Sequence, residues 1–134
     1  MGHLQTIHVV DDDAMLRVSL DILLRAEGYV VHSHESAEAF LNSIEKGDVG
    51  CIVTDVNMPG MTGIELLFEM CKLHMSMPAI VISGLMDARL KQASEEQGAF
   101  RCFQKPVNLD ALLAAIHAAL IQAYGGDQNP AFSR

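Results

Sequence analysis

Acidic side chains stand at the ends of two short, β-branched apolar segments. Asp11 and Asp12 follow residues 6–10, and Asp55 closes residues 51–55. Such segments are typical of buried parallel strands, whose ends lie at the rim of a sheet. Because adjacent strands lie about 4.8 Å apart, we expect the three carboxylates to reach one ion. The pattern predicts a divalent-metal site, with Mg²⁺ as the expected cofactor because it prefers oxygen ligands.

A hydroxyl and an ammonium group follow the same pattern later in the chain. Two further apolar segments end in Ser83 and Lys105. Phosphoryl transfer needs an in-line nucleophile and positive charge spread over the transferring oxygens. Lys105 can supply a mobile charge and Ser83 a neutral hydrogen-bond donor. Together with the aspartates, these residues predict a site for a phosphoryl group.

Strand-like and helix-like patterns alternate five times along the chain. The expected strands are residues 6–10, 29–33, 51–55, 79–83 and 101–103. The expected buried helical stripes are Leu16, Leu20, Leu23 and Leu24; Ala37, Phe40, Leu41 and Ile44; Ile64, Leu67, Phe68 and Cys71; and Leu109, Leu112, Leu113, Ile116 and Leu120. A helix over residues 86–97 has the weakest stripe. The alternation predicts an α/β fold with a parallel sheet covered on both faces. Ligands then bind beyond the carboxyl ends of the strands.

Local signals mark where these helices begin and end. The expected N-caps are Asp13, Ser36 and Asn108, and the expected helix ends are Gly28 and Gly47. Gly60-x-x-Gly63 is interpreted as a turn and helix entry, because a phosphate-binding P-loop would need a following Gly-Lys-Ser/Thr.

Length and composition indicate one acidic domain. The chain has 134 residues, half of them hydrophobic and none of them Trp, so we expect one aliphatic core. Residues 1–124 are expected to form the domain and residues 125–134 a flexible tail or linker stub. The net charge of -8 argues against direct binding to nucleic acid. The apolar stretch 109–121 is too short to span a bilayer, so we expect a cytoplasmic protein without a membrane partner.

Cysteines and histidines offer no recognisable metal motif. Three cysteines without a C-x-x-C spacing are expected to be buried, reduced thiols (Cys51, Cys71 and Cys102). The six histidines show no metal-binding spacing beyond His32-x-His34, and surface or core roles are expected for all of them (His3, His8, His32, His34, His74 and His117).

Four segments together resemble the receiver domains of two-component response regulators. They are Val9-Val10-Asp11-Asp12, residues 54–60 (Thr-Asp-Val-Asn-Met-Pro-Gly), Val81-Ile82-Ser83-Gly84 and Lys105-Pro106. The similarity covers about residues 5–123, and residues 36–41 and 55–67 look closest to FixJ-like receivers. The resemblance implies a flavodoxin-like (βα)5 doubly wound sheet with strand order 2-1-3-4-5. In that order the winding reverses between the two strands that carry the aspartates.

The same resemblance implies roles for the residues at the strand ends. Asp55 would accept a phosphoryl group from a histidine kinase or a histidine phosphotransfer protein. Ser83 and Lys105 would then contact phosphoryl oxygens, and the Lys105–Pro106 bond would be cis. A receiver is not an enzyme with an external substrate, since it catalyses only its own phosphorylation and dephosphorylation.

The resemblance also implies a ligand set for Mg²⁺ and an output. Asp12 and Asp55 would bind the ion through carboxylates, Asn57 through its backbone carbonyl, and Asp11 through water. FixJ-like receivers are commonly followed by a helix-turn-helix transcription module, so transcription is the expected output. The chain is then either an excised receiver or a single-domain regulator. A homodimer through the fourth helix, fifth strand and fifth helix is also expected.

One position departs from the family pattern. Receivers usually carry Tyr or Phe three residues before the lysine, and here that position is Cys102. Strand alternation points Phe103 to the opposite face, and Phe100 lies two residues upstream. We therefore expect activation to move Ser83 and the following loop, with a different side chain sensing the change.

Two other functional classes share part of this pattern. A hydrolase of the haloacid dehalogenase type has Asp-x-Asp after its first strand, which Asp11-x-Asp13 matches formally. Ala14-Met15, however, replaces the Gly-Thr-like continuation of that fingerprint. A flavodoxin-like flavin binder is disfavoured because the aspartates would repel its phosphate and no Ser/Thr/Gly phosphate loop follows the first strand.

Overall fold

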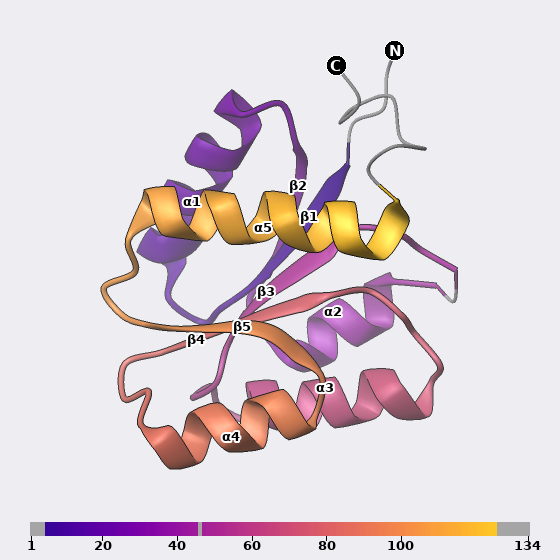
Figure 1. Ribbon diagram of the computed structural model, residues 1–134, viewed down its shortest axis with the longest axis vertical. Helices are drawn as coiled ribbons and strands as arrows, with labels where there is room; N and C mark the ends of the chain where they lie inside the picture. Colours follow the sequence, from indigo (N-terminus) through magenta and orange to yellow (C-terminus); the bar gives the residue numbers. More distant parts are fainter. Residues whose placement is uncertain (1–4, 46, 126–134) are drawn as a thin grey trace.

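Five parallel strands form one sheet between two layers of helices (Figure 1). The computed structural model describes residues 5–45 and 47–125. The elements are β1 (Thr6–Val10), α1 (Ala14–Ala26), β2 (Val30–His34), α2 (Ala37–Ser43), β3 (Cys51–Asp55), α3 (Gly63–Lys72), β4 (Ala79–Ser83), α4 (Ala88–Glu96), β5 (Ala99–Gln104) and α5 (Leu109–Tyr124). The strand order is β2-β1-β3-β4-β5, which confirms the expected doubly wound topology.

Each face of the sheet has its own aliphatic core. Helices α1 and α5 cover one face, while α2, α3 and α4 cover the other (Figure 1). The central strands β3 and β4 are buried throughout, which explains their uninterrupted apolar sequences. Of the helices in residues 5–45 and 47–125, none is long and apolar enough to cross a membrane. The tail expected at residues 125–134 lies outside the described residues, apart from Gly125.

Side-chain caps fix the starts of the helices. Asp13, Ser36 and Asn108 accept hydrogen bonds from backbone N–H groups of the first turns, as expected from the sequence. Helix α3 begins with a reciprocal capping box between Thr62 and Glu65. These caps set where each helix departs from the carboxyl end of the preceding strand.

Three sequence-based expectations about the helices were wrong. Helix α3 buries Gly63, Leu66, Leu67 and Met70, whereas Phe68 is 51% exposed and Cys71 is also exposed. Apolar residues occupy both sides of this helix, so periodicity alone could not choose the buried side. Helix α2 ends at Ser43, well before Gly47. Leu109 is 43% exposed at the first turn of α5.

Helix α4 is the least firmly packed of the five helices. Its only fully buried residue among those described is Ser94, whose hydroxyl donates a hydrogen bond to the Leu90 carbonyl (2.8 Å). A helix with so little buried apolar surface opens at low free-energy cost. The weak apolar stripe in the sequence is thus reflected in the packing.

The last turn of α5 is tied to the sheet by Tyr124. Its hydroxyl accepts from the Gly50 N–H (2.9 Å) and donates to the Gly50 carbonyl (2.8 Å). Gly50 immediately precedes β3, so this contact lies at the amino ends of the strands, opposite the aspartates.

Candidate functional site

Three aspartates converge at the carboxyl ends of β1 and β3. These strands are neighbours in register Val10↔Thr54, so Asp11 and Asp55 follow at the same level. A carboxylate oxygen of each of Asp11, Asp12 and Asp55 lies within 4.8 Å of the others. Asp11 and Asp55 are buried, and Asp12 is exposed. The cluster therefore combines two buried carboxylates with a third that is open to solvent.

Lys105 reaches this cluster from the end of β5. Its Nζ lies 3.1 Å from Asp11 Oδ2 and 3.3 Å from Asp55 Oδ2. The Lys105–Pro106 peptide bond is cis, as expected. One ammonium group thus neutralises part of the charge of two buried carboxylates.

Ser83 ends β4 beside these residues and is fully buried. Its Oγ accepts a hydrogen bond from the Leu85 N–H (3.1 Å), which orients the hydroxyl within the turn before α4. The neighbouring register Asp55↔Ile82 places Ser83 one residue beyond the end of β3. The hydroxyl, the ammonium and the carboxylates therefore share one edge of the sheet.

The charges of the site act on one another. Burial raises the pKa of Asp55 above its ordinary 3.8, and the charge of Asp11 adds to this, against the opposing effect of Lys105. Burial alone would lower the pKa of Lys105, but the hydrogen bond and charge of Asp11, then Asp55, raise it. A second cation would relieve the remaining repulsion between the carboxylates.

One buried oxygen shows that the site fits a metal ion. Asp11 Oδ2 has no well-aligned hydrogen-bond donor, although it lies near Lys105 Nζ. A buried carboxylate oxygen without a donor is costly unless a cation satisfies it. Together with the carboxylates of Asp12 and Asp55, Asp11 makes a donor set suited to a hard divalent ion.

The remaining candidates occupy less central positions. Asp13 caps α1 by accepting from Met15 N–H (3.0 Å) and Leu16 N–H (3.3 Å). Its own N–H donates to Asp11 Oδ1 (2.9 Å), which orients that carboxylate. Asn57 is exposed in the loop after β3. Its backbone carbonyl as a metal ligand stays a prediction.

The positioning roles of Arg17 and Gly63 were not predicted from the sequence. The Arg17 guanidinium donates to the Asp11 carbonyl (2.5 Å) and holds the backbone at the end of β1. Gly63 lies so close to β3 that an added Cβ would stand 2.2 Å from the Asp55 carbonyl oxygen. The capping box Thr62-x-x-Glu65 was a readable signal for this helix start, but the close approach depends on the tertiary fold.

Cys102, which differs from the aromatic residue expected from the family pattern, lies on β5 and faces α4. Cys102 is half-buried on the α4 side of the sheet, whereas Phe100 and Phe103 pack on the opposite face. Burial raises the pKa of the Cys102 thiol, and a hydrogen bond with the Ser94 side chain opposes this rise. A small polar contact therefore stands between β5 and α4.

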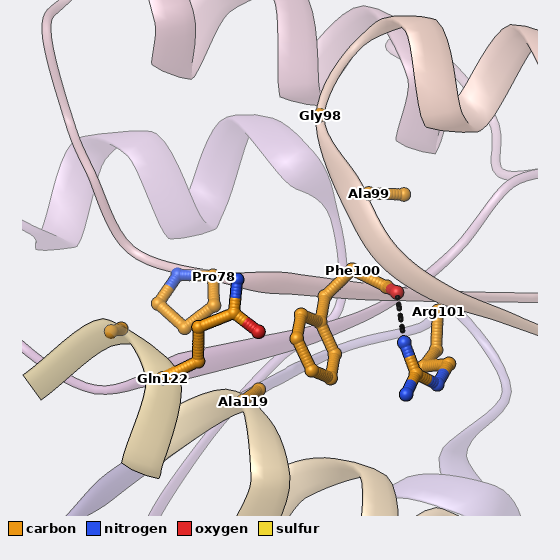
Figure 2. Close-up of a pocket in the computed structure, with 8 residues that line it drawn as sticks. Pro78, Gly98, Ala99, Phe100, Arg101, Ala119 and Gln122 are labelled. Carbon is orange, nitrogen blue, oxygen red and sulfur yellow. Dashed lines mark hydrogen bonds between the residues drawn. The ribbon is translucent and has the colours of Figure 1, made fainter. Parts of the chain in front are cut away.

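A separate cavity of about 500 Å³ lies at the other end of the sheet (Figure 2). Figure 2 shows Phe100 in its wall, with the Arg101 guanidinium donating to the Phe100 carbonyl (3.0 Å). The lining residues are Pro78, Gly98, Ala99, Phe100, Arg101, Ala119, Gln122 and Ala123. They include no carboxylate or nucleophile, so the cavity offers no comparable chemistry.

Comparison with known proteins agrees with this geometry. Residues 7–117 match the family described as response regulator receiver domain. The transcriptional regulatory protein FixJ of Azorhizobium caulinodans is 43% identical over 114 residues, covering 85% of this chain and 54% of that protein. FixJ of Bradyrhizobium diazoefficiens is 39% identical over 122 residues, covering 91% of this chain and 58% of that protein. The chain thus spans little more than half the length of these relatives.

Solved structures show the same fold. The response regulator StyR superposes with a TM-score of 0.86 at 34% identity, covering 93% of this chain and 63% of that chain. The structure named FixJ-N has a TM-score of 0.77 at 36% identity, covering 89% and 94%. With the fold, the strand order and the sequence in agreement, the chain belongs to the response regulator receiver domain family and is a FixJ-like receiver.

Proposed function

We propose that this chain is a phosphorylation-activated switch whose phosphoacceptor is Asp55. The phosphoryl donor is a histidine kinase or a histidine phosphotransfer protein, and the reaction depends on Mg²⁺. The observation that carries this proposal is the cluster of Asp11, Asp12 and Asp55 around Lys105 at the carboxyl ends of the strands. Receivers of this family are regulatory domains and do not act on an external substrate.

Mg²⁺ would be held by the carboxylates of Asp12 and Asp55, the Asn57 carbonyl and, through water, Asp11. The buried Asp11 Oδ2, which has the Lys105 ammonium beside it but no well-aligned donor, and the exposed Asp12 support this ligand set. When bound, the ion supplies positive charge beside the phosphoryl oxygens. Asp12 faces solvent, so the ion can exchange without opening the core.

The transfer step uses the carboxylate of Asp55 as nucleophile. A bond forms between a carboxylate oxygen and phosphorus while the phosphorus–nitrogen bond to the donor histidine breaks. The departing imidazole keeps the bonding electron pair and takes up a proton. The Val56 N–H donates to Asp55 Oδ1 (2.8 Å) and thereby fixes the rotation of the carboxylate before attack.

Switching follows from contacts that exist only after transfer. The Ser83 hydroxyl would donate to one phosphoryl oxygen and Lys105 would pair with another. Ser83 would then give up its present contact with the Leu85 N–H, which moves the start of the segment leading to α4. With Cys102 at the usual aromatic position, we infer that the Ser94–Cys102 contact senses this movement.

The output is proposed to be control of transcription through a domain outside this chain. The curated relatives named FixJ are transcriptional regulatory proteins that extend well beyond the matched region. Phosphorylation is proposed to promote a homodimer through α4, β5 and α5. The partner is proposed to be a protein in the cytoplasm. The net charge of -8 argues against direct contact with nucleic acid.

The deciding experiment is intact mass after incubation with acetyl phosphate and Mg²⁺. We expect one phosphoryl adduct that is lost with EDTA and in Asp55→Asn. An adduct that persists in Asp55→Asn would contradict the assignment of the acceptor. Steady phosphate release that survives Asp55→Asn but is lost in Asp11→Asn would instead show a hydrolase of the dehalogenase type.

A further inference from the structure

Three histidines gather on one face of the sheet edge formed by β1 and β2. His8 lies on β1, and His32 and His34 lie on β2, with His8 paired in register with His32. Residues two apart on a strand share a face, so all three rings lie on the side covered by α2. Their spacing in the sequence concealed this cluster, because His8 is 24 residues away from His32.

Two of these rings meet at a distance typical of ligands of one metal ion. His8 Nδ1 and His34 Nε2 share a hydrogen bond of 3.2 Å. Zinc–nitrogen bonds of about 2.05 Å at a tetrahedral angle separate two nitrogens by about 3.3 Å. The third ring, His32, stacks against His8 with centroids 5.6 Å apart. An ion that displaced the shared proton would therefore need almost no change in the separation of the two nitrogens.

The packing around His8 and His34 favours metal binding. Phe40 of α2 contacts both rings edge-on, at 5.1 Å from His8 and 5.2 Å from His34. A cavity of about 380 Å³ opens beside the cluster, lined by all three histidines together with Thr6, Ser43, Asp48 and Val49. Burial, followed by the neighbouring imidazoles, lowers the pKa of His8 from 6.5 to about 4. Neutral imidazole, the form that binds metals, therefore prevails at neutral pH.

We propose that His8, His34 and His32 form a second metal site, for a transition-metal ion of the zinc class. His8 and His34 are the preformed ligands. His32 is exposed on the edge strand and completes the set by rotating toward the opening, which leaves the fourth position to water. Imidazole ligands favour Zn²⁺ over Mg²⁺, so this site is chemically distinct from the carboxylate cluster.

The backbone connects this site to the aspartates. The Asp11 N–H donates to the His34 carbonyl (3.1 Å). An ion held by His8 and His34 would fasten β2 to β1 immediately beside Asp11. Zinc binding is therefore expected to stiffen the base of the phosphorylation site without occupying it.

The test is calorimetric titration with Zn²⁺ of a background variant from which competing ligands have been removed by substitution. Asp12→Asn and Asp55→Asn remove the carboxylate site, and His3→Gln removes a histidine outside the described residues. We expect one Zn²⁺ per chain in this background. His34→Gln retains a hydrogen-bonding side chain and should weaken binding at least tenfold, as should His32→Gln, whose exposed position makes misfolding an improbable cause.

Matched controls come from helix α3 and its end. Cys71 and His74 are both exposed and only three residues apart, so they form the main competing pair. Cys71→Ser with His74→Gln should leave the affinity unchanged. Co²⁺ in place of Zn²⁺ should give the intense visible absorption of a tetrahedral site, and this absorption should disappear with His34→Gln.

Three results would overturn the proposal. One is the absence of Zn²⁺ binding in the background protein. A second is binding that survives both His34→Gln and His32→Gln. A third is binding that is lost with the Cys71 and His74 substitutions, which would place the ion at α3.

Discussion

The Lys105 N–H donates to the Ser83 carbonyl at 2.8 Å, so the two groups proposed to contact the phosphoryl group share one backbone hydrogen bond. This bond joins the ends of β4 and β5. Movement of Ser83 toward a phosphoryl oxygen is therefore transmitted to the residue that carries the ammonium group. The pair is expected to respond as a unit.

Removing the Lys105 ammonium should lower the stability of the protein, because the clustered carboxylates then repel one another without a cation between them. Lys105→Ala leaves Asp11 and Asp55 buried without their cationic partner, so we expect a loss of roughly 2 kcal/mol in the free energy of unfolding. Mg²⁺ should raise Tm more in this variant than in the parent, because it replaces the missing charge. Thermal unfolding with Mg²⁺ or EDTA measures both effects. Lys105→Met, which retains an apolar stem, should behave in the same way, and a Tm response to Mg²⁺ smaller than that of the parent would contradict the argument.

Metal affinity should depend on Asp12 and far less on its neighbour. Asp12→Asn removes the exposed carboxylate ligand, and we expect Mg²⁺ affinity to fall at least tenfold. Asp13→Ser removes the same charge one residue away but retains a helix N-cap, so its effect should be only a few-fold. Titration calorimetry compares the two variants. Equal losses would show that general charge, and no specific ligand, attracts the ion.

Gly63 should be intolerant of even one methyl group. Gly63→Ala would drive a Cβ against the Asp55 carbonyl oxygen, forcing α3 away from β3. We expect a loss of about 1–3 kcal/mol in stability and weaker Mg²⁺ binding, because the loop bearing Asn57 joins these elements. Gly84→Ala is the control, since an added Cβ there meets nothing within 4 Å. Urea unfolding measures the stability of both variants. Equal losses of stability in Gly63→Ala and Gly84→Ala would refute the prediction.

The raised pKa of Asp55 predicts a specific pH dependence of stability. The folded carboxyl binds its proton more tightly than the unfolded one, whose pKa is near 3.8. As pH rises from that value through the higher folded pKa, the unfolding free energy should therefore fall. Asp55→Asn should lack this decrease and be more stable at pH 7, by a few degrees in Tm. Unfolding curves from pH 4 to 7 in EDTA would show it, and a variant less stable than the parent at pH 7 would disprove it.

An aromatic ring at position 102 should alter the coupling to α4. Cys102→Tyr inserts a large side chain where the thiol meets Ser94, so α4 must shift, at a cost of about 1–3 kcal/mol. We expect phosphorylation-dependent dimerisation to change, as measured by sedimentation with and without acetyl phosphate. Cys102→Ser preserves the small volume and serves as control. Identical dimerisation in Tyr and Ser variants would mean that this position does not sense activation.

The ends of β1, β3 and β4 were predictable because buried parallel strands leave apolar segments that stop at a polar residue. β3 and β4 have the predicted bounds for that reason. The expected bounds 29–33 and 101–103 were wrong for β2 and β5, which are only partly buried. The buried side of α3 was not predictable, since apolar residues occur on all sides of this helix. Caps such as Asp13 need only local chemistry and were therefore identified.

The finer geometry of the site depends on which strands become neighbours. The burial of Asp11 Oδ2 beside Asp55 and the close approach of Gly63 arise only after β1, β3 and α3 pack together. The contact between His8 and His34 likewise requires the pairing of β1 with β2. No local pattern encodes such distances, although residue types at strand ends indicate where to look.

The Tyr124–Gly50 contact has a consequence for how a signal leaves the domain. It holds the final turn of α5, and hence Gly125, at the pole of the sheet opposite Asp55. Five-residue strands separate the two poles by about 16 Å. Gly125 and Asp55 therefore lie at opposite poles of the sheet. A displacement that starts at Asp55 is expected to reach Gly125 through the strands and helices that lie between them.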